Sequence, residues 1–174
     1  VLEQYGYICE LDFYILSEVC NDIKEQLEKG LDPVTVSVNF SRYHFIDQKE
    51  DFSFIKRIIN TIFSYDIDTK YIEIEFTEAG MLDDYTIINR FVEILKIYGI
   101  KVTIDDYGKG YSSLELLSQV PFDIIKMDKS FVDEYNTESG RIILSSTIDM
   151  MKKLGKIVVC EGIENEEQIN YLKN

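Results

Sequence analysis

Apolar residues recur with two different periods along the chain, and the two periods predict helices and strands. In six segments they return every three to four positions, as in Phe54, Ile55, Ile58, Ile59 and Ile62, which predicts amphipathic helices. The predicted helices cover residues 12–29, 52–64, 85–98, 113–119, 139–154 and 164–172. Three of them are followed directly by a glycine that ends a helix: Gly30, Gly99 and Gly155.

Short runs rich in β-branched residues lie between these helices and predict strands. The predicted strands cover residues 34–40, 71–78, 101–104, 124–128 and 156–162. A strand followed by a helix occurs five times, which predicts a parallel sheet with right-handed crossovers. In the second strand, acidic residues take every second position until Thr77, an unusual alternation. Because no linker, low-complexity tract or repeat interrupts the pattern, we expect one α/β domain over residues 1–174.

The composition narrows the function classes. The chain is 45% hydrophobic and 29% charged, which is typical of a soluble globular protein. It has 32 acidic against 18 basic residues and a net charge of -14, which argues against binding to nucleic acid polymers or anionic membranes. An anionic substrate stays compatible with this charge if metal ions lie between protein and phosphate. No apolar run is long enough to span a bilayer, so we expect no membrane contact from this segment.

The cysteines and the histidine carry no chemistry in this interpretation. Cys9, Cys20 and Cys160 are an odd number in apolar surroundings, so we interpret them as reduced core residues. This predicts a cytoplasmic domain, whose parent protein can still be anchored in a membrane. His44 is the single histidine, which excludes a mechanism that needs two histidines from this chain. We interpret His44 as an ordinary loop or surface residue.

Two adjacent aspartates, Asp105 and Asp106, follow the third strand and precede a glycine-spaced turn. Neighbouring carboxylates repel each other unless a positive charge lies beside them, and a divalent cation with oxygen ligands is the usual solution. Alternatively, Asp-Asp-x-Gly is only a turn in which the aspartates accept hydrogen bonds from backbone amides. After the turn, Ser112 and Ser113 can cap the next helix.

Every predicted strand ends in polar or charged groups, and in parallel α/β folds these ends face one shared site. In strand order the groups are Asn39; Glu75 and Glu78; Asp105 and Asp106; Lys126 and Asp128; Glu161 and Glu164. Any one of them can be a helix cap or a solvated rim residue. Five in succession predict a common site, where such closely packed carboxylates must hold cations or stay partly protonated.

The oxygen ligands of this set suit Mg²⁺ or Mn²⁺ better than softer metals. Two such ions bridged by an aspartate form a site for phosphodiester hydrolysis. Lys126 can orient the attacking water or offset charge on the phosphoryl group, and Glu161 can accept the proton. Spacing alone does not assign these roles.

Five ordered motifs then point to a known family. They are Asn39-Phe40-Ser41, Glu75-Phe76-Thr77-Glu78, Asp105-Asp106-Tyr107-Gly108-Lys109-Gly110-Tyr111-Ser112-Ser113, Lys126-Met127-Asp128 and Glu161-Gly162-Ile163-Glu164. They resemble the Asn-x-Ser, Glu-x-Thr-Glu, Asp-Asp-Phe-Gly-x-Gly-Tyr-Ser-Ser, Lys-x-Asp and Glu-Gly-Val-Glu elements of the EAL domain. That family consists of phosphodiesterases that open the bacterial second messenger cyclic di-GMP.

The resemblance implies a TIM-type barrel, two Mg²⁺ or Mn²⁺ ions, cyclic di-GMP as substrate and linear pGpG as product. By the family pattern the metal ligands are Asn39, Glu75, Asp105 and Asp106, with Asp105 as the bridge. Lys126 would hold the attacking water, and Glu161 would be ligand or base. Glu78 would tether the loop after Asp106, which the family uses in metal binding and dimer communication. Asp128 and Glu164 would be supporting residues.

The sequence departs from the family pattern in a few places. Tyr107 replaces the commoner Phe, and Lys109 stands where the family often has Thr, which places a cation near the metals. No Glu-Ala-Leu motif occurs, so we expect an internal piece with about five of the eight strands of such a barrel. We expect this piece to be impaired as a catalyst, because the family's glutamate ligand is missing and the barrel cannot close.

Two other functions compete with the phosphodiesterase. A receptor would bind cyclic di-GMP without cleaving it, whereas a regulatory or dimerisation domain without a nucleotide role would have lost the acidic strand ends. The intact motifs favour the enzyme. An open sheet would also expose edge strands at 36–40 and 157–160, which predicts a homodimer or edge-to-edge association.

Overall fold

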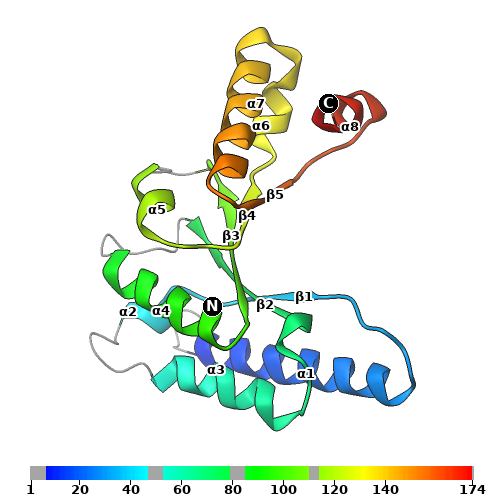
Figure 1. Cartoon of the computed structure of the whole chain (residues 1–174), viewed down its shortest axis with the longest axis vertical. Coiled ribbons are helices and arrows are strands. Elements are labelled where there is room, and N and C mark those ends of the chain that lie inside the picture. The colour runs from blue at the N-terminus through cyan, green and yellow to red at the C-terminus, as the bar shows by residue number, and fades with distance from the viewer. Residues whose placement is uncertain (1–6, 47–52, 79–84, 110–113, 174) are drawn as a thin grey trace.

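The structure is a computed structural model that describes residues 7–46, 53–78, 85–109 and 114–173. Its centre is a parallel sheet of five strands in the order β1-β2-β3-β4-β5 (Figure 1). The strands are β1 (Val36–Asn39), β2 (Ile72–Thr77), β3 (Lys101–Tyr107), β4 (Ile124–Met127) and β5 (Ile157–Cys160). The predicted α/β class with about five parallel strands and flanking helices is therefore confirmed.

Helices follow or precede each strand, as the periodicity predicts. The longer ones are α1 (Ile8–Glu28), α3 (Ser53–Ser64), α4 (Tyr85–Ile97), α5 (Leu114–Gln119), α7 (Glu138–Lys153) and α8 (Glu166–Lys173). Four short elements were not predicted: α2 (Tyr43–Ile46), α6 (Ser130–Asp133) and the 3-10 turns η2 (Thr69–Tyr71) and η4 (Glu134–Asn136). None is longer than about one helical turn, too short for a hydrophobic period to be visible.

Alternation along the strands separates the two faces of the sheet. Ile72, Ile74 and Phe76 of β2 belong to the hydrophobic core. On this face α1 packs against β1, α4 against β3 and α7 against β5, and α1 and α3 lie side by side (Figure 1). The opposite face, here called the polar face, carries Glu73 and Glu75 of the same strand. The unusual acidic alternation thus marks which face the helices do not cover.

The third strand is longer than predicted. It does not end before the aspartates but continues through Asp105 and Asp106 to Tyr107. Its register with β4 shifts between Ile104 and Tyr107, as in a β-bulge, and Asp106 has a positive φ of 54°. A bulge redirects side chains at a strand end, and sequence alternation alone does not reveal it. The predicted cap by Ser112 and Ser113 lies outside the described residues.

Two interpretations of single residues need correction. His44 is not a loop or surface residue but is 4% exposed, on the short helix α2. Of the three cysteines, Cys20 is fully buried, whereas Cys9 and Cys160 are half-buried. Burial raises the pKa of the Cys20 thiol to about 11. Within the described residues, no helix is long and apolar enough to cross a membrane.

Candidate metal centre at the strand ends

Four neighbouring strands bring the charged side chains of the polar face together. Glu75 belongs to β2, Asp105 to β3 and Lys126 to β4, and Glu161 directly follows β5. The parallel register holds these positions at one edge of the sheet, because Thr77 pairs with Asp105 and Met127 pairs with Cys160. The predicted convergence of these four residues is what the structure shows.

Lys126 lies among the carboxylates of three strands. Its Nζ atom is 2.9 Å from Glu75 Oε1, 3.1 Å from Asp105 Oδ1 and 2.9 Å from Glu161 Oε1. Burial lowers the pKa of Lys126, but the attraction of the three carboxylates outweighs it and raises the pKa well above its usual range. The side chain is therefore a permanent cation that offsets part of the negative charge of the site.

Glu75 is the most deeply buried acid of the group, with 2% of its surface exposed. Burial raises its pKa and Lys126 lowers it, while the neighbouring Asp105 raises it further, and the net shift is upward. Glu75 therefore depends on a nearby cation to stay ionised.

Asp105, Asp106 and Glu161 form a set that suits a metal ion. Each offers one carboxylate oxygen, and these oxygens lie within 4.8 Å of one another. Asp105 Oδ1 is buried and, among the described residues, accepts no hydrogen bond of acceptable geometry, although Lys126 Nζ is at ion-pair distance. A buried acceptor without a donor is what a hard cation would satisfy. The set thus fits Mg²⁺ or Mn²⁺, and the alternative of a plain turn does not account for Asp105.

Asp106 has a different partner. Its Oδ2 atom is 3.0 Å from Lys109 Nζ, three residues further along the chain. The Lys109 side chain is 63% exposed. The departure from the family's common threonine therefore places an ammonium group directly on a predicted metal ligand.

Glu78 lies beneath the turn that follows β3. It is 8% exposed, and its Oε2 atom accepts a hydrogen bond of 2.9 Å from the Gly108 backbone N–H. Gly108 has a φ of 101° and packs directly on Phe131. These contacts fix the turn to the residue that follows β2 and to α6.

The remaining predicted residues, Asp128, Asn39 and Glu164, differ in burial and in their local partners. Asp128 is buried at the start of α6, where its Oδ1 accepts a hydrogen bond of 2.9 Å from Ser130 N–H, and bonds from Ser130 lower its pKa. Asn39 is exposed and pairs in register with Glu75. Glu164 is exposed in the turn before α8, where its backbone N–H donates to Gln168 Oε1. The structure thus does not bring the Glu164 side chain into the cluster formed by the described residues.

A second polar layer beneath the site was not predicted. Glu73 Oε2 accepts hydrogen bonds from Ser37 Oγ at 3.1 Å and from Thr103 Oγ1 at 3.5 Å. Ser37, Glu73 and Thr103 belong to β1, β2 and β3. Each lies two positions before a predicted metal ligand of the same strand: Asn39, Glu75 and Asp105. The acidic alternation of β2 was the signal for this layer, although its partners could not be identified from it.

A buried histidine–aspartate pair supports the end of β1. Asp12 Oδ2 is 2.9 Å from His44 Nε2 and accepts a hydrogen bond of 2.8 Å from Ser41 N–H. His44 also stacks on Phe54. Asp12 thus fixes the chain two residues after Asn39. The pair spans 32 positions of sequence, and no local pattern indicated it.

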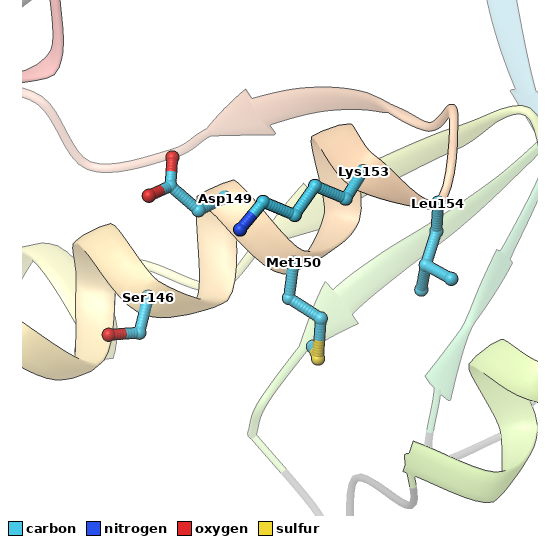
Figure 2. A pocket seen from close by; sticks show the side chains of 5 residues that line it. All are labelled: Ser146, Asp149, Met150, Lys153 and Leu154. Carbon is cyan, nitrogen blue, oxygen red and sulfur yellow. The ribbon is translucent and has the colours of Figure 1, made fainter.

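The structure also has hollows away from the acidic cluster. One of about 440 Å³ lies on α7 and is lined by five residues: Ser146, Asp149, Met150, Lys153 and Leu154 (Figure 2). None of them is a predicted site residue, and we assign no ligand to it.

Comparison with known proteins agrees with the motifs. The EAL domain family model matches residues 1–174. The chain is 30% identical over 172 residues to the oxygen sensor protein DosP of Escherichia coli (strain K12), with 98% of this chain and 21% of DosP covered. It is 27% identical over 168 residues to the cyclic di-GMP phosphodiesterase PdeA of Borreliella burgdorferi, with 96% of this chain and 24% of PdeA covered. The chain thus spans about a fifth to a quarter of the length of these curated relatives.

A solved structure gives the same result for the fold. The PaMucR phosphodiesterase in complex with c-di-GMP superposes with a TM-score of 0.85 at 26% identity, covering 99% of this chain and 68% of that one. The fold is therefore that of EAL domains, as the motifs implied.

Proposed function

Because this chain belongs to the EAL domain family, we propose that its acidic strand ends form a phosphodiesterase site that hydrolyses cyclic di-GMP to linear pGpG. The observation that carries this proposal is the convergence of Lys126 with Glu75, Asp105 and Glu161 at one edge of the sheet. PdeA is named for this activity and PaMucR was solved with this nucleotide, which supports the choice of substrate.

Asn39, Glu75, Asp105 and Asp106 would hold two Mg²⁺ or Mn²⁺ ions. When bound, these ions supply Lewis acidity to the phosphoryl oxygens and lower the pKa of water. The cluster formed by Asp105, Asp106 and Glu161 supports the part of this assignment that concerns Asp105 and Asp106, since its oxygens lie within 4.8 Å of one another.

The chain's own residues would then transfer the proton and stabilise the developing charge. Water adds to one phosphorus atom as one phosphodiester P–O bond breaks. Glu161 accepts the proton that the water loses, and the oxygen that leaves takes up a proton from solvent to become a hydroxyl group. Lys126 stays protonated throughout and stabilises the negative charge that develops on the phosphoryl oxygens. Glu78 and Asp128 would support the site without contacting the substrate, by fixing the turn after β3 and the start of α6. Glu164 would be a more distant supporting residue.

The test is hydrolysis of cyclic di-GMP by the intact protein with Mg²⁺ or Mn²⁺, with products separated by chromatography. We expect pGpG, and we expect Glu161→Ala to lower the rate by roughly 10² to 10⁴, the usual contribution of a general base. Glu166→Ala removes an exposed carboxylate five positions further on and should leave the rate unchanged.

A folded, metal-loaded protein that forms no pGpG would contradict the phosphodiesterase proposal. If such a protein still binds cyclic di-GMP, the receptor function takes its place.

A further inference from the structure

The turn after β3 holds Lys109 against Asp106 by two contacts. Lys109 backbone N–H donates to the Asp106 carbonyl oxygen at 3.1 Å, and Lys109 Nζ lies 3.0 Å from Asp106 Oδ2. The first contact fixes the backbone of Lys109 and the second places its ammonium group on the carboxylate. A lysine side chain is charged near neutral pH.

The rest of the structure keeps this turn in place. Glu78 accepts the Gly108 N–H, and Phe131 packs so closely on Gly108 that an added Cβ atom would lie 2.0 Å from its ring. The turn therefore has little freedom to move away from Asp106. The Lys109 side chain, by contrast, is 63% exposed and can leave Asp106 without disturbing the buried contacts of this turn.

We propose that Lys109 is a built-in competitor of the divalent cation at Asp106, which weakens metal binding to this carboxylate until the ion displaces the ammonium group. The inference rests on the metal site of the proposed function and adds a residue that sets its affinity. It concerns a position at which this chain departs from the common family pattern.

Lys109 and Lys126 differ in the strength of the ion pairs that a metal ion would have to break. Lys126 is 23% exposed and contacts three carboxylates, so it belongs to the permanent structure of the site. Lys109 contacts one carboxylate that is 30% exposed. Exposed pairs of this kind are weak, so a divalent cation with twice the charge displaces the ammonium group at a modest cost. Lys109 therefore reduces affinity without blocking the site.

Calorimetric titration of the intact protein with Mn²⁺ tests the inference independently of catalysis. We expect Lys109→Met to bind Mn²⁺ roughly threefold or more tightly than wild type, because the competing charge is gone. Lys109→Arg keeps the charge and should stay close to wild type. Lys29→Met is the matched control, since Lys29 pairs with Glu25 at similar exposure, 65%, far along the chain at the end of α1.

The outcomes separate the two proposals. Tighter binding by Lys109→Met alone supports the inference. Equal affinity in wild type and all three variants overturns the competitor role and leaves the metal site standing. If neither wild type nor any variant binds Mn²⁺, the metal site of the proposed function fails, and the inference fails with it.

Discussion

Lys126 shows how a single residue can hold an acidic site together. It is the partner of Glu75, a carboxylate with only 2% of its surface exposed, and it also contacts Asp105 and Glu161. Removal of its charge leaves a buried carboxylate without compensation, and this is costly in proteins. The lysine is therefore as important for the stability of the sheet as for the proposed chemistry.

We expect Lys126→Met to lower the free energy of unfolding by about 2–3 kcal/mol without metal, less than for a fully buried pair because Lys126 is partly exposed. Mn²⁺ should restore part of the loss, since an ion can replace the missing positive charge. Urea unfolding with and without Mn²⁺ measures both effects. Lys129→Met, which removes a 70% exposed lysine of the neighbouring helix, is the control. A Lys126 variant as stable as this control would show that Glu75 needs no cation.

At the scale of single residues, the sequence predicted which strand-end side chains share a site, but it did not predict which distant residues contact each other. Glu75, Asp105, Lys126 and Glu161 could be placed in one site because each lies within the last three residues of a strand or directly after it, and parallel strands end together. The contact between Asp12 and His44 could not be predicted, because it depends on how α1 packs beside the end of β1.

At the scale of the elements, the turn after β3 is constrained both by its backbone conformation and by packing. Gly108 combines a φ of 101°, which favours glycine, with direct packing on Phe131. The bounds of the helices and strands around it were predicted to within a few residues, because hydrophobic residues repeat regularly along each of these segments. The bulge at the end of β3 and the one-turn helix α6 depend on tertiary packing and leave no period in the sequence.

Gly108→Ala should therefore destabilise the protein by about 2 kcal/mol or more, from backbone strain together with overpacking against Phe131. Gly30→Ala is the matched control, because Gly30 has a similar positive φ of 74° but open space around it. That variant should lose only about 1 kcal/mol. Thermal unfolding of the two variants gives the comparison, and equal losses would show that the contact with Phe131 contributes nothing.

Across the whole molecule, the described sheet has two outer strands, β1 and β5. On β5, Ile157 is 51% and Val159 is 41% exposed, so this edge presents apolar side chains as well as backbone groups. Exposed edges of this kind pair with other chains. The predicted edge-to-edge association thus remains a prediction with a specific location.

We expect the 174-residue chain to associate with increasing concentration, as measured by light scattering. Val159→Lys should reduce the association, because a lysine on an edge strand disfavours pairing. Ile143→Lys makes the same kind of change at a 56% exposed position of α7 and should have little effect. A chain that stays monomeric at every concentration would contradict the prediction.

The alternation of β2 has a consequence for folding fidelity. If β2 paired one residue out of register, Glu73 and Glu75 would face the helices, while Ile72, Ile74 and Phe76 would lose their places in the core. Two carboxylates buried among apolar side chains would cost several kcal/mol each, so such an intermediate is strongly disfavoured. Glu75, a proposed metal ligand, and Glu73 thereby also ensure that a newly made chain reaches one strand alignment rather than its neighbour.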